Sequence, residues 1–85
     1  AQAPALHAGL QLARELVLGG TVEAGELSER IRKFYASSLP DGQLDYLEIV
    51  DPDTLTPLSR IRRRALVAVA MHLGKARLID NTLIE

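Results

Sequence analysis

The sequence predicts an α+β domain in which two helices pack on one face of a three-stranded antiparallel sheet. Apolar residues recur at helical spacing through the first part of the chain, as far as Phe34. After the turn residues at positions 39–42 the spacing changes to two, which is typical of strands. Gly74 then permits a tight turn between two later strands. Helices followed by strands in this order favour a helical layer on a sheet.

The first predicted helix runs from Pro4 to Leu18. Pro4 lies in the first turn, where a missing N–H costs no hydrogen bond, and Gly19 and Gly20 end the helix because glycine tolerates positive φ. The apolar residues of its buried row lie three or four positions apart. They are Leu6, Leu10, Ala13 and Val17.

A second helix is predicted to begin after Thr21, which is the expected N-cap residue. Leu27, Ile31 and Phe34 form its apolar stripe. The acidic residues of this helix precede its basic residues, an order that suits the helix macrodipole. We interpret these charges as a solvated outer face.

Three strands are predicted after the helices. The first spans Leu44 to Asp51, with Leu47 and Ile49 on the same side. The segment from Arg64 to Leu73 fits a buried strand or a helix by periodicity alone, and its two alternate valines favour a strand. The third strand is predicted from Ala76 to Asp80. Short connections between these strands predict a β-meander.

Composition indicates one small domain. The chain has 85 residues, a formal net charge of −1 and no cysteine, so it has room for one core and lacks disulfides and a thiol nucleophile. The balanced charge favours neither a membrane nor a nucleic acid as partner. The expected location is the cytoplasm. The chain starts with alanine, which we interpret as the sign of a fragment or a processed product, and its apolar first helix is compatible with a homodimer.

Few residues have the chemistry of an active site. His7 and His72 have no acidic partner at an obvious spacing, so neither predicts a metal site or an acid–base pair. No nucleophile elbow or phosphate-binding glycine loop is found in the sequence. The four carboxylates of the first strand and the turn after it, Asp45, Glu48, Asp51 and Asp53, are predicted to contact solvent or to cap turns. We therefore predict no catalytic residue and no metal ligand in this chain.

The most distinctive local feature is a dense group of arginines, Arg60, Arg62, Arg63 and Arg64. We expect Lys75 and Arg77 to lie close to this group across a hairpin. Such a group can be a solvated segment, an interdomain contact or a site for phosphate or nucleic acid. The chain has only two tyrosines and one phenylalanine, so it offers little aromatic surface on which bases could stack.

Three segments resemble the pantothenate synthetase family. They are LDYLEIVDPDTLTPL at positions 44–58, ALVAVA at 65–70 and GKARLIDN at 74–81. They occur in the family's order and close to its spacing, which is more specific than any one segment. The residues that carry the resemblance are Asp45, Tyr46, Asp51, Pro52, Thr54, Leu55, Gly74, Arg77, Asp80 and Asn81.

The resemblance implies that residues 1–85 are the C-terminal domain of such an enzyme. The family joins pantoate to β-alanine with ATP and magnesium through a pantoyl adenylate, and its N-terminal domain holds ATP. The implied role of this chain is a lid that closes over that partner domain and is inactive alone. Arg60, Arg62, Arg63 and Arg64 are then candidates to face the nucleotide, whereas Asp80 and Asn81 are expected to make hydrogen bonds at a turn or strand end. The alternative is an independent module that binds a polyanion through the arginines.

Overall fold

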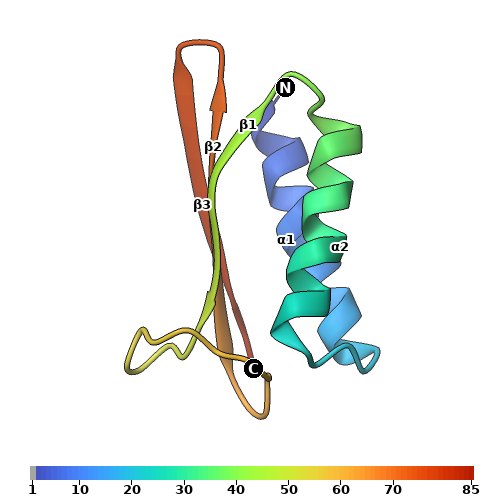
Figure 1. Ribbon diagram of the computed structural model, residues 1–85, viewed down its shortest axis with the longest axis vertical. Coiled ribbons are helices and arrows are strands. Elements are labelled where there is room, and N and C mark those ends of the chain that lie inside the picture. Colours follow the sequence, from blue (N-terminus) through green and yellow to red (C-terminus); the bar gives the residue numbers. More distant parts are fainter. Residues whose placement is uncertain (1) are drawn as a thin grey trace.

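Two helices cover one face of a three-stranded sheet, as the sequence predicts (Figure 1). The computed structural model describes residues 2–85, and the side chains of residues 4–85. The elements follow in the order α1 (Gln2–Leu18), α2 (Ala24–Ser38), β1 (Gln43–Val50), β2 (Ala65–Leu73) and β3 (Ala76–Ile84). The ambiguous apolar segment is therefore a strand, and the α+β prediction is confirmed.

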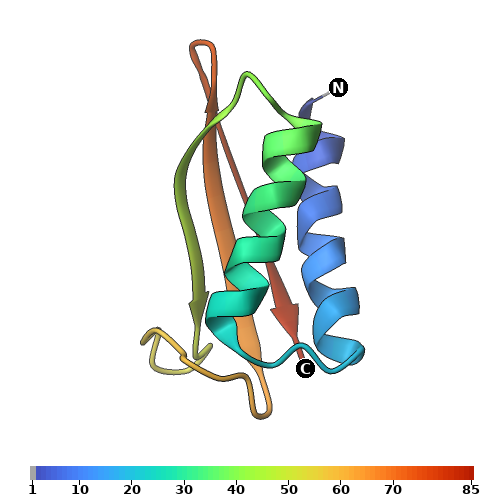
Figure 2. The same cartoon turned by 45° about the vertical axis from the view of Figure 1, so that its right-hand side comes forward.

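The sheet is an antiparallel meander with the strand order β1-β2-β3. The two helices lie side by side over it (Figure 2), with α1 packed against β3 and α2 against β1. β3 continues to Ile84 instead of ending at Asp80, so Asp80 and Asn81 lie in the middle of a strand. The expectation that these two residues belong to a turn or strand end was wrong, because the last residues of the chain find a full row of partners along β2.

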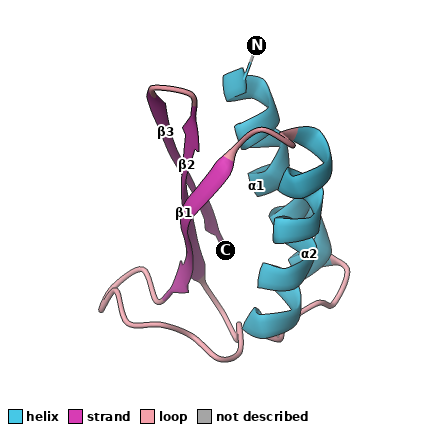
Figure 3. Cartoon of the chain, turned by 45° about the horizontal axis from the view of Figure 1, so that its top comes forward, coloured by secondary structure: helices cyan, strands magenta, loops and turns pink. Residues whose placement is uncertain are grey.

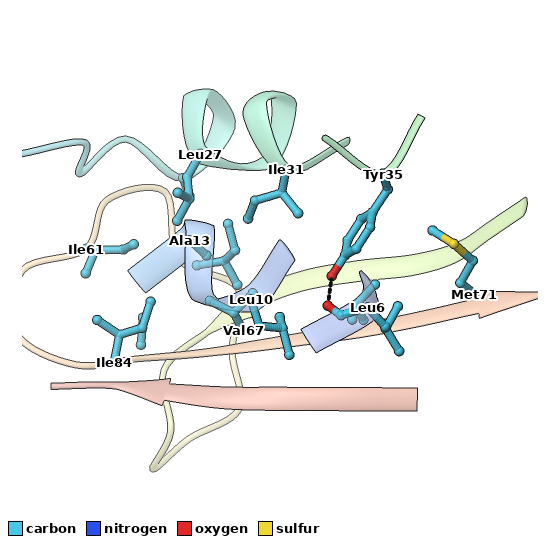
Figure 4. Packing of buried hydrophobic residues seen from close by; sticks show 14 of the residues in the cluster. Leu6, Leu10, Ala13, Leu27, Ile31, Tyr35, Ile61, Val67, Met71 and Ile84 are labelled. Carbon is cyan, nitrogen blue, oxygen red and sulfur yellow. Dashed lines mark hydrogen bonds between the residues drawn. The ribbon is translucent and has the colours of Figure 1, made fainter. Parts of the chain in front are cut away.

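The core lies between the helices and the sheet (Figure 4). Its largest members that are almost fully buried are Tyr35, Leu10, Leu27, Ile31, Met71, Ile84, Val67 and Val69. The predicted stripe of α2 placed Phe34 in the core, but Phe34 is only partly buried and Tyr35 takes that position. Burial is possible for this tyrosine because its hydroxyl donates a hydrogen bond to the Leu6 carbonyl at 2.6 Å.

The N-terminus of α2 is capped by a residue that lies far away in the sequence. Glu23 is the N-cap residue instead of the predicted Thr21, and its side chain makes no capping hydrogen bond. The first helical N–H, that of Ala24, donates to the Ser59 carbonyl at 3.0 Å. A backbone acceptor 35 residues later, by the difference between 59 and 24, thus replaces a local cap. Sequence reasoning about local caps does not detect such a partner.

Residues 51–64 connect β1 to β2, and we call this segment the arginine loop. Figure 3 shows it extending from the end of the sheet where β1 finishes and β2 begins. Pro57 bridges back to Val50, and Arg60 bridges to Glu23. The loop is therefore attached both to the edge strand β1 and to the start of α2.

Candidate functional site

Asp51 organises the first half of the arginine loop. Its Oδ1 accepts hydrogen bonds from the backbone N–H groups of Asp53 at 2.8 Å and Thr54 at 3.0 Å. These N–H donors, with Thr54 contributing most, hold the pKa of the Asp51 carboxyl below its ordinary value. The Asp51 carbonyl also accepts from the N–H of Leu55 at 2.8 Å. The prediction that carboxylates here cap turns is confirmed for Asp51.

The second half of the loop is held by α2 and the turn before it. Ile61 is 5% exposed, and its N–H donates to the Val22 carbonyl at 2.8 Å. Arg60 Nη1 donates to Glu23 Oε1 at 2.9 Å. A buried side chain and several hydrogen bonds therefore keep the loop in one conformation, although it contains no helix or strand.

A hollow of about 410 Å³ lies in this loop. Its lining residues include the four arginines of the group, Arg60, Arg62, Arg63 and Arg64, together with Asp51 and Asp53. Two further carboxylates, those of Glu23 and Glu85, lie next to Arg60 and Arg64, so the charges around the hollow balance. What suits the hollow to a ligand with anionic oxygens is therefore the guanidiniums that have no carboxylate beside them.

The four arginines differ in their partners. Arg60 is paired with Glu23, whereas Arg64 lies 3.6 Å from both Asp53 Oδ2 and Glu85 Oε2. At that distance the buried Nε of Arg64 forms no hydrogen bond. Arg62 and Arg63 are exposed, and neither forms an ion pair with any side chain of residues 4–85. These two guanidiniums are therefore the ones available to a ligand.

The expected proximity of Lys75 and Arg77 to this group was wrong. The β2–β3 register pairs His72 with Arg77 and Ala65 with Ile84, so Arg77 and the loop lie at opposite ends of the strands. Figure 1 shows the β2–β3 hairpin at one end of the molecule and the arginine loop at the other. The arginine loop leads into the start of β2, and the hairpin connects the end of β2 to the start of β3. The loop and the hairpin are therefore at opposite ends of β2.

Arg77 belongs to a second cluster, on β1 and the hairpin. Its Nη2 and Nε donate to Asp45 Oδ2 at 2.8 and 3.1 Å, and its guanidinium lies 5.9 Å from the centre of the Tyr46 ring. Asp45 sits where the β1 register shifts, between Leu44 and Tyr46. The family-like segments at 44–58 and 74–81 thus meet here. In the sequence, only the family resemblance of these two segments drew attention to Asp45 and Arg77. Their contact could not be predicted, because it depends on the register of the strands.

Both histidines are exposed, and both have carboxylate neighbours that their spacing in the sequence does not show. His7 Nδ1 lies 3.4 Å from Asp80 Oδ2, and His72 Nε2 lies 3.7 Å from Asp45 Oδ2. Strand pairing and helix packing create these pairs between residues far apart in sequence. In the part of the chain that the structure describes, no group of three or more His, Cys, Asp and Glu side chains comes together in an arrangement that could hold a metal ion. In the same part of the chain, no helix is both long and apolar enough to cross a bilayer.

The described residues define a small α+β domain with an arginine-lined hollow and a second charged cluster at its opposite end. The chain belongs to the pantoate-beta-alanine ligase family, because the model of that family matches residues 1–83. The residues that suggested the family in the sequence, from Asp45 to Asn81, all lie in the matched region.

Individual relatives agree with this assignment. The chain is 55% identical over 84 residues to a pantothenate synthetase of Nitratidesulfovibrio vulgaris (strain DSM 19637 / Miyazaki F), covering 99% of the chain and 30% of that relative. It is 50% identical over 80 residues to the one of Oleidesulfovibrio alaskensis, covering 94% and 28%. A crystal structure of pantothenate synthetase from Thermus thermophilus superimposes with a TM-score of 0.82 at 37% identity, covering 95% and 29%.

The chain spans about 30% of the length of these relatives. It is therefore similar to one part of a pantothenate synthetase, the C-terminal portion.

Proposed function

We propose that residues 1–85 form the closing domain of a pantothenate synthetase. In the proposed reaction the pantoate carboxylate attacks the α-phosphorus of ATP, pyrophosphate leaves, and pantoyl adenylate forms. The amine of β-alanine then attacks the acyl carbon, and AMP leaves. The observation that supports this proposal most is the family match over residues 1–83, in a chain that spans only about 30% of the length of its relatives. Such an enzyme is expected to act in the cytoplasm.

Closure is the step that this domain contributes in our proposal. Pantoyl adenylate is a mixed anhydride, and water that reaches it wastes one ATP for each molecule hydrolysed. A domain that covers the site excludes that water and keeps the intermediate for β-alanine. Its partner is the part of the enzyme that holds ATP and magnesium. We assign magnesium to that part, because Mg²⁺ is commonly bound through the phosphates of the nucleotide together with one or two carboxylates.

Within this domain we assign the nucleotide-facing role to the arginine loop. Arg62 and Arg63 line the hollow without carboxylate partners among the described side chains, so their guanidiniums are free to bind phosphate oxygens. Arg60 and Arg64 line it too, but each also has carboxylate neighbours, and we assign to them the role of holding the loop. The alternative of an independent polyanion-binding module is not favoured, because the family match covers nearly the whole chain.

A chimera tests this proposal. The matched portion of the Nitratidesulfovibrio relative is replaced by this chain, and a second protein lacks that portion altogether. We expect the chimera to form pantothenate, and the shortened protein to consume ATP with little pantothenate. A folded chimera without activity would contradict the proposal, as would pantothenate formation by the 85-residue chain alone.

Arginine variants of the same chimera test the assignment within the loop. Loss of one charge-assisted contact to phosphate costs about 1.5–3 kcal/mol, so Arg62→Ala or Arg63→Ala should raise the KM for ATP roughly tenfold or more. Lys75→Ala removes a positive charge at the opposite end of the sheet and is the matched control. An equal effect of all three variants would indicate a general charge effect instead of a site.

A further inference from the structure

Leu55 has a backbone conformation that leucine rarely adopts. Its φ is 59°, and of the residues that the structure describes it is the only non-glycine with positive φ. The left-handed region brings the Cβ of an L-residue close to the following carbonyl oxygen, so glycine or asparagine usually occupies such a position. The local fold of the loop therefore does not favour a leucine here.

Within the described structure, the side chain of Leu55 makes no core contact that would offset the unfavourable backbone conformation. It is 64% exposed and lies outside the hydrophobic core. Two other large apolar residues are equally exposed, Leu18 and Ile79, but they lie in a regular helix and strand, where leucine and isoleucine fit without strain. Leu55 combines an unfavourable backbone with an unfavourable exposure. A glycine at position 55 would serve the turn better.

The loop nevertheless fixes Leu55 firmly. Asp51 binds both sides of the turn, since its carbonyl accepts from the N–H of Leu55 and its own N–H donates to the Thr56 carbonyl at 2.9 Å. The Oγ1 atoms of Thr54 and Thr56, on either side of Leu55, lie 2.7 Å apart. A strained residue persists where surrounding contacts over-determine it, and such residues cluster at sites of function. The loop therefore holds the backbone of an exposed apolar residue in one conformation.

We propose that Leu55 is a docking residue, which seats in an apolar pocket of the remaining part of the enzyme when this domain closes. The proposal rests on the closing-domain function above and names one of its contacts. We place the pocket in the rest of the enzyme because of chain length. The chain spans about 30% of the length of its relatives, so most of such an enzyme is available to provide the pocket. Leu55 shares its loop with Arg62 and Arg63, so one segment would carry both the apolar anchor and the two guanidiniums without carboxylate partners.

The test uses Leu55→Gly and Leu55→Asn, two residues that accept positive φ. In the 85-residue chain, which has its own buried core, we expect a melting temperature equal to or above that of the wild type, because strain is relieved and no core contact is lost. In the chimera we expect kcat for pantothenate to fall about tenfold or more, the factor expected when burial of one leucine is lost, and more ATP to be used per pantothenate formed.

Opposite signs in the two assays distinguish docking from a structural role. If both variants lower the melting temperature and the activity together, Leu55 supports the loop and the proposal is wrong. Unchanged activity also overturns it. Leu18→Ala removes an equally exposed leucine from the end of α1 and should change neither readout. Activity of the unmutated chimera tests the closing function separately, so a failure of one proposal is not mistaken for a failure of the other.

Self-association through Leu55 is a further outcome of the test. Sedimentation of the 85-residue chain at several concentrations, with and without Leu55→Gly, measures it. A dimer that the variant abolishes would assign the pocket to a second copy and overturn the proposed occupant.

Discussion

Gly9 is the residue through which α1 lets Tyr35 approach. A Cβ built on Gly9 would lie 2.3 Å from Tyr35 Cζ and 2.4 Å from its hydroxyl oxygen. The Tyr35 ring is 2% exposed and is held by the hydrogen bond to Leu6, so it cannot move aside without losing that bond. Burial, followed by the charge of Asp80, also raises the pKa of this phenol, which therefore remains a neutral donor.

Gly9→Ala is therefore expected to destabilise the chain although alanine is the better helix former. Alanine gains about 1 kcal/mol of helix propensity, but overpacking a fixed ring costs about 1–3 kcal/mol and occasionally more. Because a Cβ 2.3 Å from the ring lies far inside contact distance, we take the upper end of that range and expect a net loss of about 2 kcal/mol, or roughly 8–16 °C in melting temperature. Gly25→Ala is the control, because a Cβ there meets nothing within 4 Å. It should leave stability unchanged or raise it, and a stable Gly9→Ala would contradict the packing described.

At the scale of elements, the arginine loop depends on one carboxylate. The Asp51 pKa is lowered by the N–H groups of Thr54 and Asp53, so the charged form contributes stability above the ordinary value of 3.8, and this contribution is lost as the pH falls through the lowered pKa. We expect the protection factor of the Leu55 amide, its exchange rate relative to an unfolded chain at the same pH, to fall in that acidic range. Asp51→Ala should show low protection at neutral pH, whereas Asp51→Asn, which keeps one acceptor oxygen, should lie between. A protection factor that is independent of pH and of these substitutions would exclude this role of Asp51.

The elements themselves were largely predictable, and the contacts between them were not. Periodicity predicted both helices and the first strand, because the apolar spacing reports the buried face directly. The second strand was decided by its two alternate valines, and the third was predicted to end at Asp80 although it continues to Ile84. Thr21 was wrong as N-cap because the acceptor that replaces it, Ser59, comes from a distant loop. Phe34 was wrong as a core residue because the neighbouring Tyr35 finds a hydrogen-bond partner in α1.

The candidate site was predictable in part. The arginine group stands out in the sequence, and the structure places its members around one hollow. Its separation from Lys75 and the pairing of His72 with Asp45 follow from strand direction and register, which composition does not report. The sequence did not indicate the positive φ of Leu55, because that conformation is expected for glycine and asparagine and not for leucine.

At the scale of the whole molecule, the two ends of the described chain are tied together. Arg14 Nη2 in α1 donates to Thr82 Oγ1 and to the Leu83 carbonyl, each at 2.9 Å. Ile84 is 2% exposed and faces Ala65 across the sheet. The last residues of β3 therefore complete the core beneath the first helix.

Removal of residues 82–85 is expected to unfold the chain. Loss of a buried isoleucine alone costs about 2–5 kcal/mol, a large share of the stability of a small domain. Circular dichroism at 25 °C should show loss of helix and strand together. Removal of Glu85 alone is the control, because its side chain is 70% exposed and its 3.6 Å contact with Arg64 is not a hydrogen bond, so it contributes about 0–1 kcal/mol. A shortened chain that melts like the intact one would show that the end of β3 is dispensable.

The tie between α1 and β3 also affects how the protein is made. Within this domain a ribosome delivers α1 before β3, so the apolar stripe of α1 stays partly uncovered until Ile84 has left the exit tunnel. Local contacts within α1 and α2 can form before then, whereas the core closes only after β3 has emerged. Translation that stops early would release a chain with exposed leucines, which is the kind of product that chaperones and proteases remove.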